Sequence, residues 1–149
     1  MNGLAVDVKG FKAVGMTYFG DNNNGEIPDL WKAFNSQFNN VKDKSIPMLF
    51  YGICDSDMDE ENRFNYCACV KVDSYTDVPE NMVTKNVPDG KYLVYTYAGE
   101  IKDLGSFYDK IFMELMPKSG YSIDERPQLE LYDERFMKTG EFDIYIPVK

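Results

Sequence analysis

Histidine is absent from this chain of 149 residues, and its absence excludes several kinds of chemistry. A Ser-His or Cys-His nucleophilic site cannot form without an imidazole base, and histidine-ligated metal sites are excluded too. Proton transfer near neutral pH would need a Glu, Asp, Lys, Tyr or Cys side chain with a shifted pKa. The glycine-containing segments show no phosphate-binding pattern, so we expect neither a metal nor a cofactor.

Cysteine is scarce, and long apolar runs are missing. The three cysteines are Cys54, Cys67 and Cys69, and no secretory signal is visible, so free thiols in a reducing compartment are favoured. Cys67 and Cys69 share one face of a predicted strand and suit packing, because a free thiol behaves as a small hydrophobe. No stretch approaches the roughly 20 apolar residues that cross a bilayer. We expect a cytoplasmic protein that does not enter a membrane.

Basic residues are fewer than acidic ones: 16 basic and 25 acidic side chains give a net charge of −9. An acidic surface repels phosphate backbones, so we do not expect the chain to bind nucleic acid by itself. Cationic ligands or basic protein partners are easier to accommodate. Aromatic residues, in contrast, make up 15% of the chain, and tyrosine suits both a core and a pocket because its apolar ring carries a polar tip.

Hydrophobic periodicity predicts two helices and several strands. The first helix has a stripe made of Leu30, Trp31, Phe34 and Phe38. The second runs from Leu104 to Leu115, and we expect Pro117 and Gly120 to end it. Alternating or continuous apolar patterns predict strands at 11–19, 47–54, 64–72, 91–98, 128–133 and 142–148.

The order strand, helix, strand, strand occurs twice, which predicts an ancient duplication. Residues 10–20 resemble 90–100, and residues 30–38 resemble 106–115. We predict a single α+β domain over 1–149, with one module at about 5–75 and another at about 88–149. A pseudo-two-fold axis would relate the modules within an antiparallel sheet, and a central ligand cleft would lie where they meet. The segment 78–90 would be the ordered connection.

Five stretches together resemble the GyrI-like family, which also supplies the effector-binding domain of multidrug-sensing transcription regulators of the AraC and MerR types. They are IPDLWKAF at 27–34, FYGICD at 50–55, VPDGKYLVYTYAGEIKDLGSFYDKIFMELMPKSGY at 87–121, PQLELYDE at 127–134 and EFDIYIPVK at 141–149. The resemblance implies that lipophilic cationic ligands bind between two modules. It implies that Glu130 meets the positive charge and that aromatic side chains line the rest, namely Trp31, Phe34, Tyr51, Phe112 and Phe142.

Glu130 is also unusual without that resemblance. Strand alternation places it with Gln128 and Tyr132, a pattern that fits either a polar outer surface or a pocket. Alignment of the two modules matches Glu130 with Tyr51, so we predict that these two side chains face each other across the pseudo-two-fold axis. A carboxylate among aromatic rings favours an organic cation, because ion pairing offsets desolvation and ring faces add cation–π attraction.

Three functional hypotheses follow. The first is a stand-alone binding protein that senses or sequesters lipophilic aromatic cations, or serves as the effector module of a transcription regulator. The second is a hydrolase of reactive cyclopropane-type compounds that uses Glu130 and Tyr51 as an acid–base pair. The third is a gyrase-inhibitor-like protein with a protein partner. The first strand begins near residue 5, which leaves no room for a helix-turn-helix, so we do not expect transcription control by this polypeptide alone.

Two further features remain open at this point. An exposed edge strand could pair two copies, so the chain could be a monomer or a homodimer. Residues 55–59 resemble the start of a calcium-binding loop, but Glu60 and Tyr66 fall where that loop requires glycine and glutamate. We therefore expect a solvated hairpin loop there.

Overall fold

The computed structural model describes residues 3–55 and 58–149. Within them, eight strands form one sheet: β1 (Leu4–Val8), β2 (Phe11–Gly20), β3 (Phe50–Cys54), β4 (Phe64–Val72), β5 (Val83–Val87), β6 (Gly90–Tyr97), β7 (Gln128–Tyr132) and β8 (Phe142–Pro147). Their order across the sheet is β1-β6-β8-β7-β3-β4-β2-β5, and the paired neighbours are antiparallel. The predicted α+β fold with an antiparallel sheet is confirmed. Part of the predicted hairpin loop at 55–59 lies outside the described residues.

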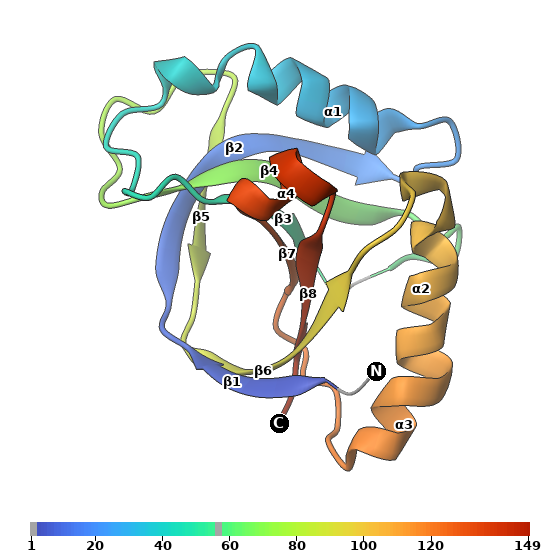
Figure 1. Ribbon diagram of the computed structural model, residues 1–149. Coiled ribbons are helices and arrows are strands. Elements are labelled where there is room, and N and C mark those ends of the chain that lie inside the picture. The colour runs from blue at the N-terminus through green and yellow to red at the C-terminus, as the bar shows by residue number, and fades with distance from the viewer. Residues whose placement is uncertain (1–2, 56–57) are drawn as a thin grey trace.

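The sheet curls because two short links join its opposite ends. Lys9 and Gly10 connect β1, at one end of the strand order, to β2, which is next to last at the other. Pro88 and Asp89 connect β5 to β6 in the same way. Links this short cannot cross a flat sheet of this width, so the two ends must approach each other. Figure 1 shows the resulting curled sheet, with β1 and β6 below and β2 and β4 above.

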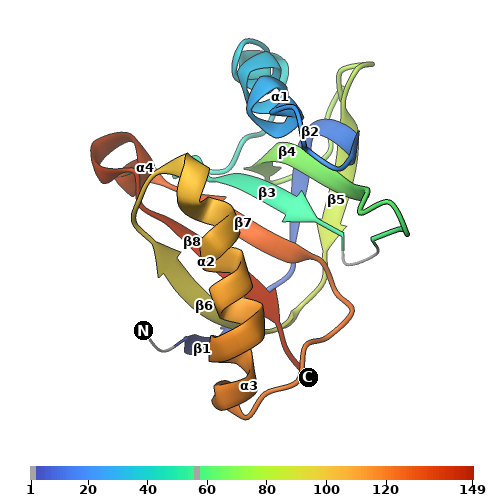
Figure 2. The same ribbon diagram turned by 90° about the vertical axis from the view of Figure 1, so that its right-hand side faces the viewer.

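The two halves have the same order of elements. The first contains β2, α1 (Glu26–Asn35), β3 and β4, and the second contains β6, α2 (Leu104–Lys110), β7 and β8. Strands β3 and β7 pair at the middle of the sheet and join the halves. Figure 2 shows α1 and α2 on the outside of the sheet, with β3 and β7 crossing the region between them. The ancient duplication itself stays a prediction.

The second predicted helix continues past Leu115 and Pro117 and ends at Gly120, so the predicted end is confirmed for Gly120 and wrong for Pro117. A π-helical turn over Ile111–Leu115 follows α2, and α3 (Met116–Ser119) contains Pro117 near its start. The ring of Pro117 clashes with a regular preceding helical turn, and the wider π-helical turn lies directly before it. Gly120 ends the helix with φ 80°, in the left-handed region that glycine adopts readily.

Three elements differ from the expectations for their segments. Helix α1 ends at Asn35, and Phe38 lies in the short 3-10 turn Phe38–Asn40 but still packs edge-to-face on Phe50 at 5.4 Å between ring centroids. Strand β5 occupies part of the connection at 78–90, where its largely exposed residues give little apolar signal. Helix α4 (Glu134–Thr139) lies between the strands predicted at 128–133 and 142–148, where we expected no helix.

Helix α4 is stabilised by polar contacts that a periodicity argument does not detect. The Asp133 side chain accepts a hydrogen bond from the backbone N–H of Arg135 at 3.0 Å and caps the helix. The Arg135 guanidinium also donates to Asp143 on β8 at 2.7 Å, next to its 2.9 Å ion pair with Asp133. These contacts fasten a six-residue helix that would be too short to persist alone.

Apolar side chains form three clusters, one inside the curled sheet and two outside it. The inner cluster contains Phe11, Ala13, Tyr51, Ile53, Cys67, Cys69, Val87, Tyr92, Leu129 and Leu131. One outer cluster packs α1 against β2 and β4, and the other packs α2 and α3 against β6 and β8. No helix in the described ranges has the length and apolar character needed to cross a membrane.

From the outer cluster under α2, we predict that a substitution of a buried residue lowers the free energy of unfolding much more than a substitution of an exposed one. Ile144 is 0% exposed, so Ile144→Ala should lower the free energy of unfolding by about 2–5 kcal/mol, because it leaves a cavity. Met137 is 87% exposed, so Met137→Ala should change it by less than about 0.5 kcal/mol. Urea denaturation of the two variants measures both values, and equal effects would contradict this assignment of the core.

Candidate functional site

The side chain of Glu130 lies at the middle of the sheet, on the outer face, and is 9% exposed. Its Oε1 atom accepts hydrogen bonds from the hydroxyls of Tyr66 at 2.7 Å and Tyr132 at 3.0 Å. Its Oε2 atom accepts one from the Tyr108 hydroxyl at 2.5 Å. We call these four residues the tyrosine cage. Because Tyr66 lies on β4, Tyr132 on β7 and Tyr108 on α2, the cage joins both halves of the molecule.

Gly52 on β3 provides the space that the cage needs. It lies directly opposite Glu130 in the β3–β7 register. A Cβ atom at this position would lie 2.1 Å from the Tyr66 hydroxyl and 2.6 Å from Glu130 Oε1. Since both distances are far below van der Waals contact, the hydrogen bond between Tyr66 and Glu130 depends on a residue without a side chain.

Trp31 on α1 extends the cage by one hydrogen bond. Its Nε1–H donates to the Tyr66 oxygen at 2.9 Å. Indole is only a donor, so the Tyr66 hydroxyl must direct its own proton toward Glu130. The Trp31 ring also meets Tyr132 edge-to-face, with 5.3 Å between the ring centroids. The first helix therefore sets both the direction of one cage hydrogen bond and the position of a second tyrosine.

Further aromatic side chains surround the cage. Tyr132 stacks on the fully buried Phe142 at 4.7 Å, and Tyr108 stacks on the half-buried Phe112 at 6.4 Å. Phe34, which is also fully buried, meets Trp31 edge-to-face at 6.1 Å. The structure thus brings four predicted residues, Trp31, Phe34, Phe112 and Phe142, into contact with the cage or with its neighbours.

The cage hydroxyls are held in their neutral form. Burial, and after it the charge of Glu130, raises the pKa of Tyr66, Tyr108 and Tyr132 well above the usual value. Each of them keeps its proton at neutral pH and so stays a donor. Burial, followed by the Glu130 charge, also raises the pKa of the neighbouring Cys54 thiol to about 12, which makes this thiol a poor nucleophile.

The predicted facing of Tyr51 and Glu130 is wrong. Tyr51 pairs with Leu131, and its side chain belongs to the inner cluster, where it stacks on Phe11 at 4.5 Å. The residue opposite Glu130 is Gly52, and a shift of one residue along a strand moves a side chain to the other face. The acid–base pair of the hydrolase hypothesis is therefore divided between opposite faces of the sheet.

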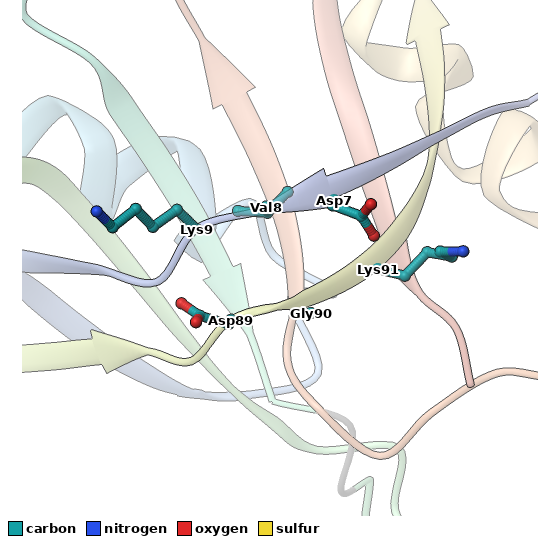
Figure 3. Close-up of a pocket in the computed structure, with 6 residues that line it drawn as sticks. All are labelled: Asp7, Val8, Lys9, Asp89, Gly90 and Lys91. Carbon is teal, nitrogen blue, oxygen red and sulfur yellow. The ribbon is translucent and has the colours of Figure 1, made fainter.

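A separate hollow lies where the curled strands bend, as Figure 3 shows. It is lined by Asp7, Val8 and Lys9 on one bend and by Asp89, Gly90 and Lys91 on the other. Two carboxylates and two ammonium groups give it mixed charge that favours no ligand. In the described parts of the chain, no cluster of Cys, Asp and Glu is arranged to hold a metal ion.

Comparison with known proteins agrees with this architecture. The profile of the integron-associated effector binding proteins, Cass2, matches residues 6–148. The chain belongs to this family. The Cass2 integron cassette protein of Vibrio cholerae has 18% identical residues and superposes with a TM-score of 0.71, over 99% of this chain and 96% of the other. The predicted GyrI-like effector-binding domain is thereby confirmed.

Two further proteins extend the comparison. Transcriptional regulator BrlR of Pseudomonas aeruginosa is 32% identical over 152 residues, which cover 99% of this chain and 56% of the regulator. This chain therefore spans about half of its length. SAV2435 bound to tetraphenylphosphonium superposes with a TM-score of 0.77 and 16% identity, over 100% of this chain and 94% of that chain. At that identity the likeness demonstrates a shared fold.

Gly52→Ala tests whether the cage depends on this glycine. The added Cβ would overlap Tyr66 and Glu130, so the free energy of unfolding should fall by about 1–3 kcal/mol. Gly105→Ala is the matched control, because no atom lies within 4 Å of its added Cβ and alanine favours a helix by about 1 kcal/mol. Thermal denaturation should show the first variant to be less stable and the second to be unchanged or more stable.

The raised tyrosine pKa values also predict how stability depends on pH. In the unfolded chain these phenols ionise near their usual value of 10.0, whereas the folded cage holds them protonated to higher pH. Their contribution is thus complete below pH 10 and is lost as the pH rises from 10 toward the folded pKa. The free energy of unfolding, measured between about pH 8 and pH 11, should fall less steeply in Tyr108→Phe than in wild type. Met137→Ala, a substitution of an exposed side chain that does not titrate, should keep the wild-type slope.

Proposed function

We propose that this chain is an effector-binding module for lipophilic aromatic cations, which Glu130 attracts to the tyrosine cage. The observation that carries the proposal is the absence of a basic partner: in residues 3–55 and 58–149, no lysine or arginine forms an ion pair with Glu130. Among the described residues, every hydrogen bond to its carboxylate comes from a phenol. Burying a carboxylate without a countercharge is costly, and a bound cation would supply that charge.

The surroundings of the carboxylate favour an organic cation over a metal ion. Trp31, Tyr108 and Tyr132 provide aromatic faces and edges next to Glu130, and a cation above such a ring gains about 0.5–2 kcal/mol. A hard metal ion would require several oxygen ligands with charge or strong dipoles. The rings instead match a ligand that is large, apolar and delocalised.

The relatives support the same class of ligand. SAV2435, which shares the fold, has a solved structure in which it is bound to tetraphenylphosphonium, a lipophilic cation. BrlR is a transcriptional regulator, and this chain matches about half of it. Sensing of an effector for transcription control, or its sequestration, is the role that we propose for this chain.

Glu130→Gln tests the proposal by removing the charge while keeping the shape. The wild type should bind tetraphenylphosphonium, and the variant should bind it at least about ten-fold more weakly, because the ion pair in a region of low dielectric is lost. Isothermal titration calorimetry measures both affinities. The same samples, analysed for a changed product after incubation with a cyclopropane-containing electrophile, test the hydrolase hypothesis.

Glu134→Gln is the matched control for that experiment. It removes the same charge from an exposed site on α4, where the Glu134 side chain is 83% exposed and lies 3.9 Å from Lys138. Long-range attraction by the acidic surface would be weakened equally in the two variants. Equal affinities of Glu130→Gln and wild type would therefore refute the role of Glu130, whereas equal losses in both variants would point to net charge alone.

A further inference from the structure

The hydrogen bonds within the tyrosine cage leave the Glu130 carboxylate with little remaining capacity. An ionised carboxylate offers about four acceptor positions, two on each oxygen. Tyr66 and Tyr132 both donate to Oε1, and Tyr108 donates to Oε2. Counting donors from residues 3–55 and 58–149, three of these positions are taken before a ligand arrives, and one position on Oε2 remains.

The remaining acceptor position is on Oε2, whose hydrogen-bond donor is held less rigidly than the two donors to Oε1. Tyr66 is 3% exposed and is held by Trp31, and Tyr132 is stacked on Phe142, so the two donors to Oε1 are fixed on central strands. Tyr108 is half-buried and lies on α2, at the outside of the sheet. A ligand that reached Glu130 from the side of α2 would therefore meet Oε2 and the Tyr108 hydroxyl.

From this arrangement we infer that the cage selects cations by the number of their N–H donors. The hydrogen bond from Tyr108 limits how many of those donors the carboxylate can accept. The inference rests on the proposed function, because it concerns the same carboxylate. A cation with no N–H or one N–H can be fully satisfied by the single open position on Oε2. A second or third N–H would find no charged acceptor, since Tyr108 occupies the other position, and a buried donor without a partner is costly.

The predicted ligands are thus quaternary and tertiary onium ions with apolar aromatic groups, and protonated primary amines are disfavoured. Net charge does not distinguish these ions, because each carries one positive charge. Discrimination therefore comes from hydrogen bonding, in the way that a site with a fixed number of partners rejects a ligand that needs a different number.

A methylation series on one aromatic scaffold tests this inference. Biphenylmethyl ammonium ions that carry three, two, one or no methyl groups on nitrogen are titrated calorimetrically into the wild type at pH 7, where all are charged. Each methyl group adds apolar area and a gradual gain in affinity. Beyond that gradual gain, we expect a step of about five-fold between the ion with two N–H groups and the ion with one.

Tyr108→Phe should move that step in affinity toward ions with more N–H groups. It frees the second position on Oε2, so the ion with two N–H groups should gain about five-fold relative to the ion with one. Tyr95→Phe is the matched control: Tyr95 is buried and its hydroxyl donates to Met116 Sδ in α3 at 3.5 Å, and it is not part of the cage. It should keep the wild-type step. Because the readout is a ratio of two affinities in each protein, a general loss of stability or affinity does not affect it.

The outcomes separate this inference from the proposed function. If the ions bind the wild type and Glu130→Gln abolishes binding, but the step is missing or does not move in Tyr108→Phe, the selection rule is wrong and the proposed function stands. If the wild type binds neither these ions nor tetraphenylphosphonium, both are overturned, and if it binds tetraphenylphosphonium alone, the selection rule is wrong and the proposed function stands. A step that moves in Tyr108→Phe and stays in Tyr95→Phe supports the selection rule.

Discussion

A buried carboxylate held by three phenol hydroxyls is the interaction on which the site depends. Glu130 receives its hydrogen bonds from two strands and one helix, so the cage forms only when both halves of the molecule are in place. Satisfying a buried charge with neutral donors lowers its cost without cancelling it. The protein therefore keeps a localised negative charge inside a region that is otherwise aromatic, and this combination is what a lipophilic cation requires.

The curled sheet brings that charge to its place. Short links at the two bends force the ends of the sheet together, so β3 and β7 form its middle and the helices lie on the outside. The inner face is then filled by one apolar cluster, and the outer face holds the Glu130 carboxylate between two further apolar clusters, one under α1 and one under α2. The proposed site thus lies on one face of the seam between the halves, and the opposite face carries the inner apolar cluster.

Much of this arrangement could be predicted from the sequence, and the failures have physical causes. Alternation correctly grouped Glu130 with Tyr132, and periodicity located both main helices. Tyr66 and Tyr108 were missed as cage residues because they come from β4 and α2, and a sequence does not state which distant elements meet. Tyr51 was assigned to the wrong face because the module alignment was displaced by one residue, and strand register tolerates no such displacement. One signal could have corrected it: Gly52 is a glycine within a strand, which often marks the close approach of another group.

Gly52 limits which residues of this site can change during evolution. Atoms of Tyr66 and Glu130 occupy the space where a side chain at position 52 would lie, so the three positions cannot vary independently. A relative with alanine or a larger residue opposite the acid would have to move the tyrosine or the carboxylate, whatever else it conserved. The glycine is therefore a marker in the sequence, and an acidic residue on the last hairpin indicates a cage of this kind only where its strand partner is glycine.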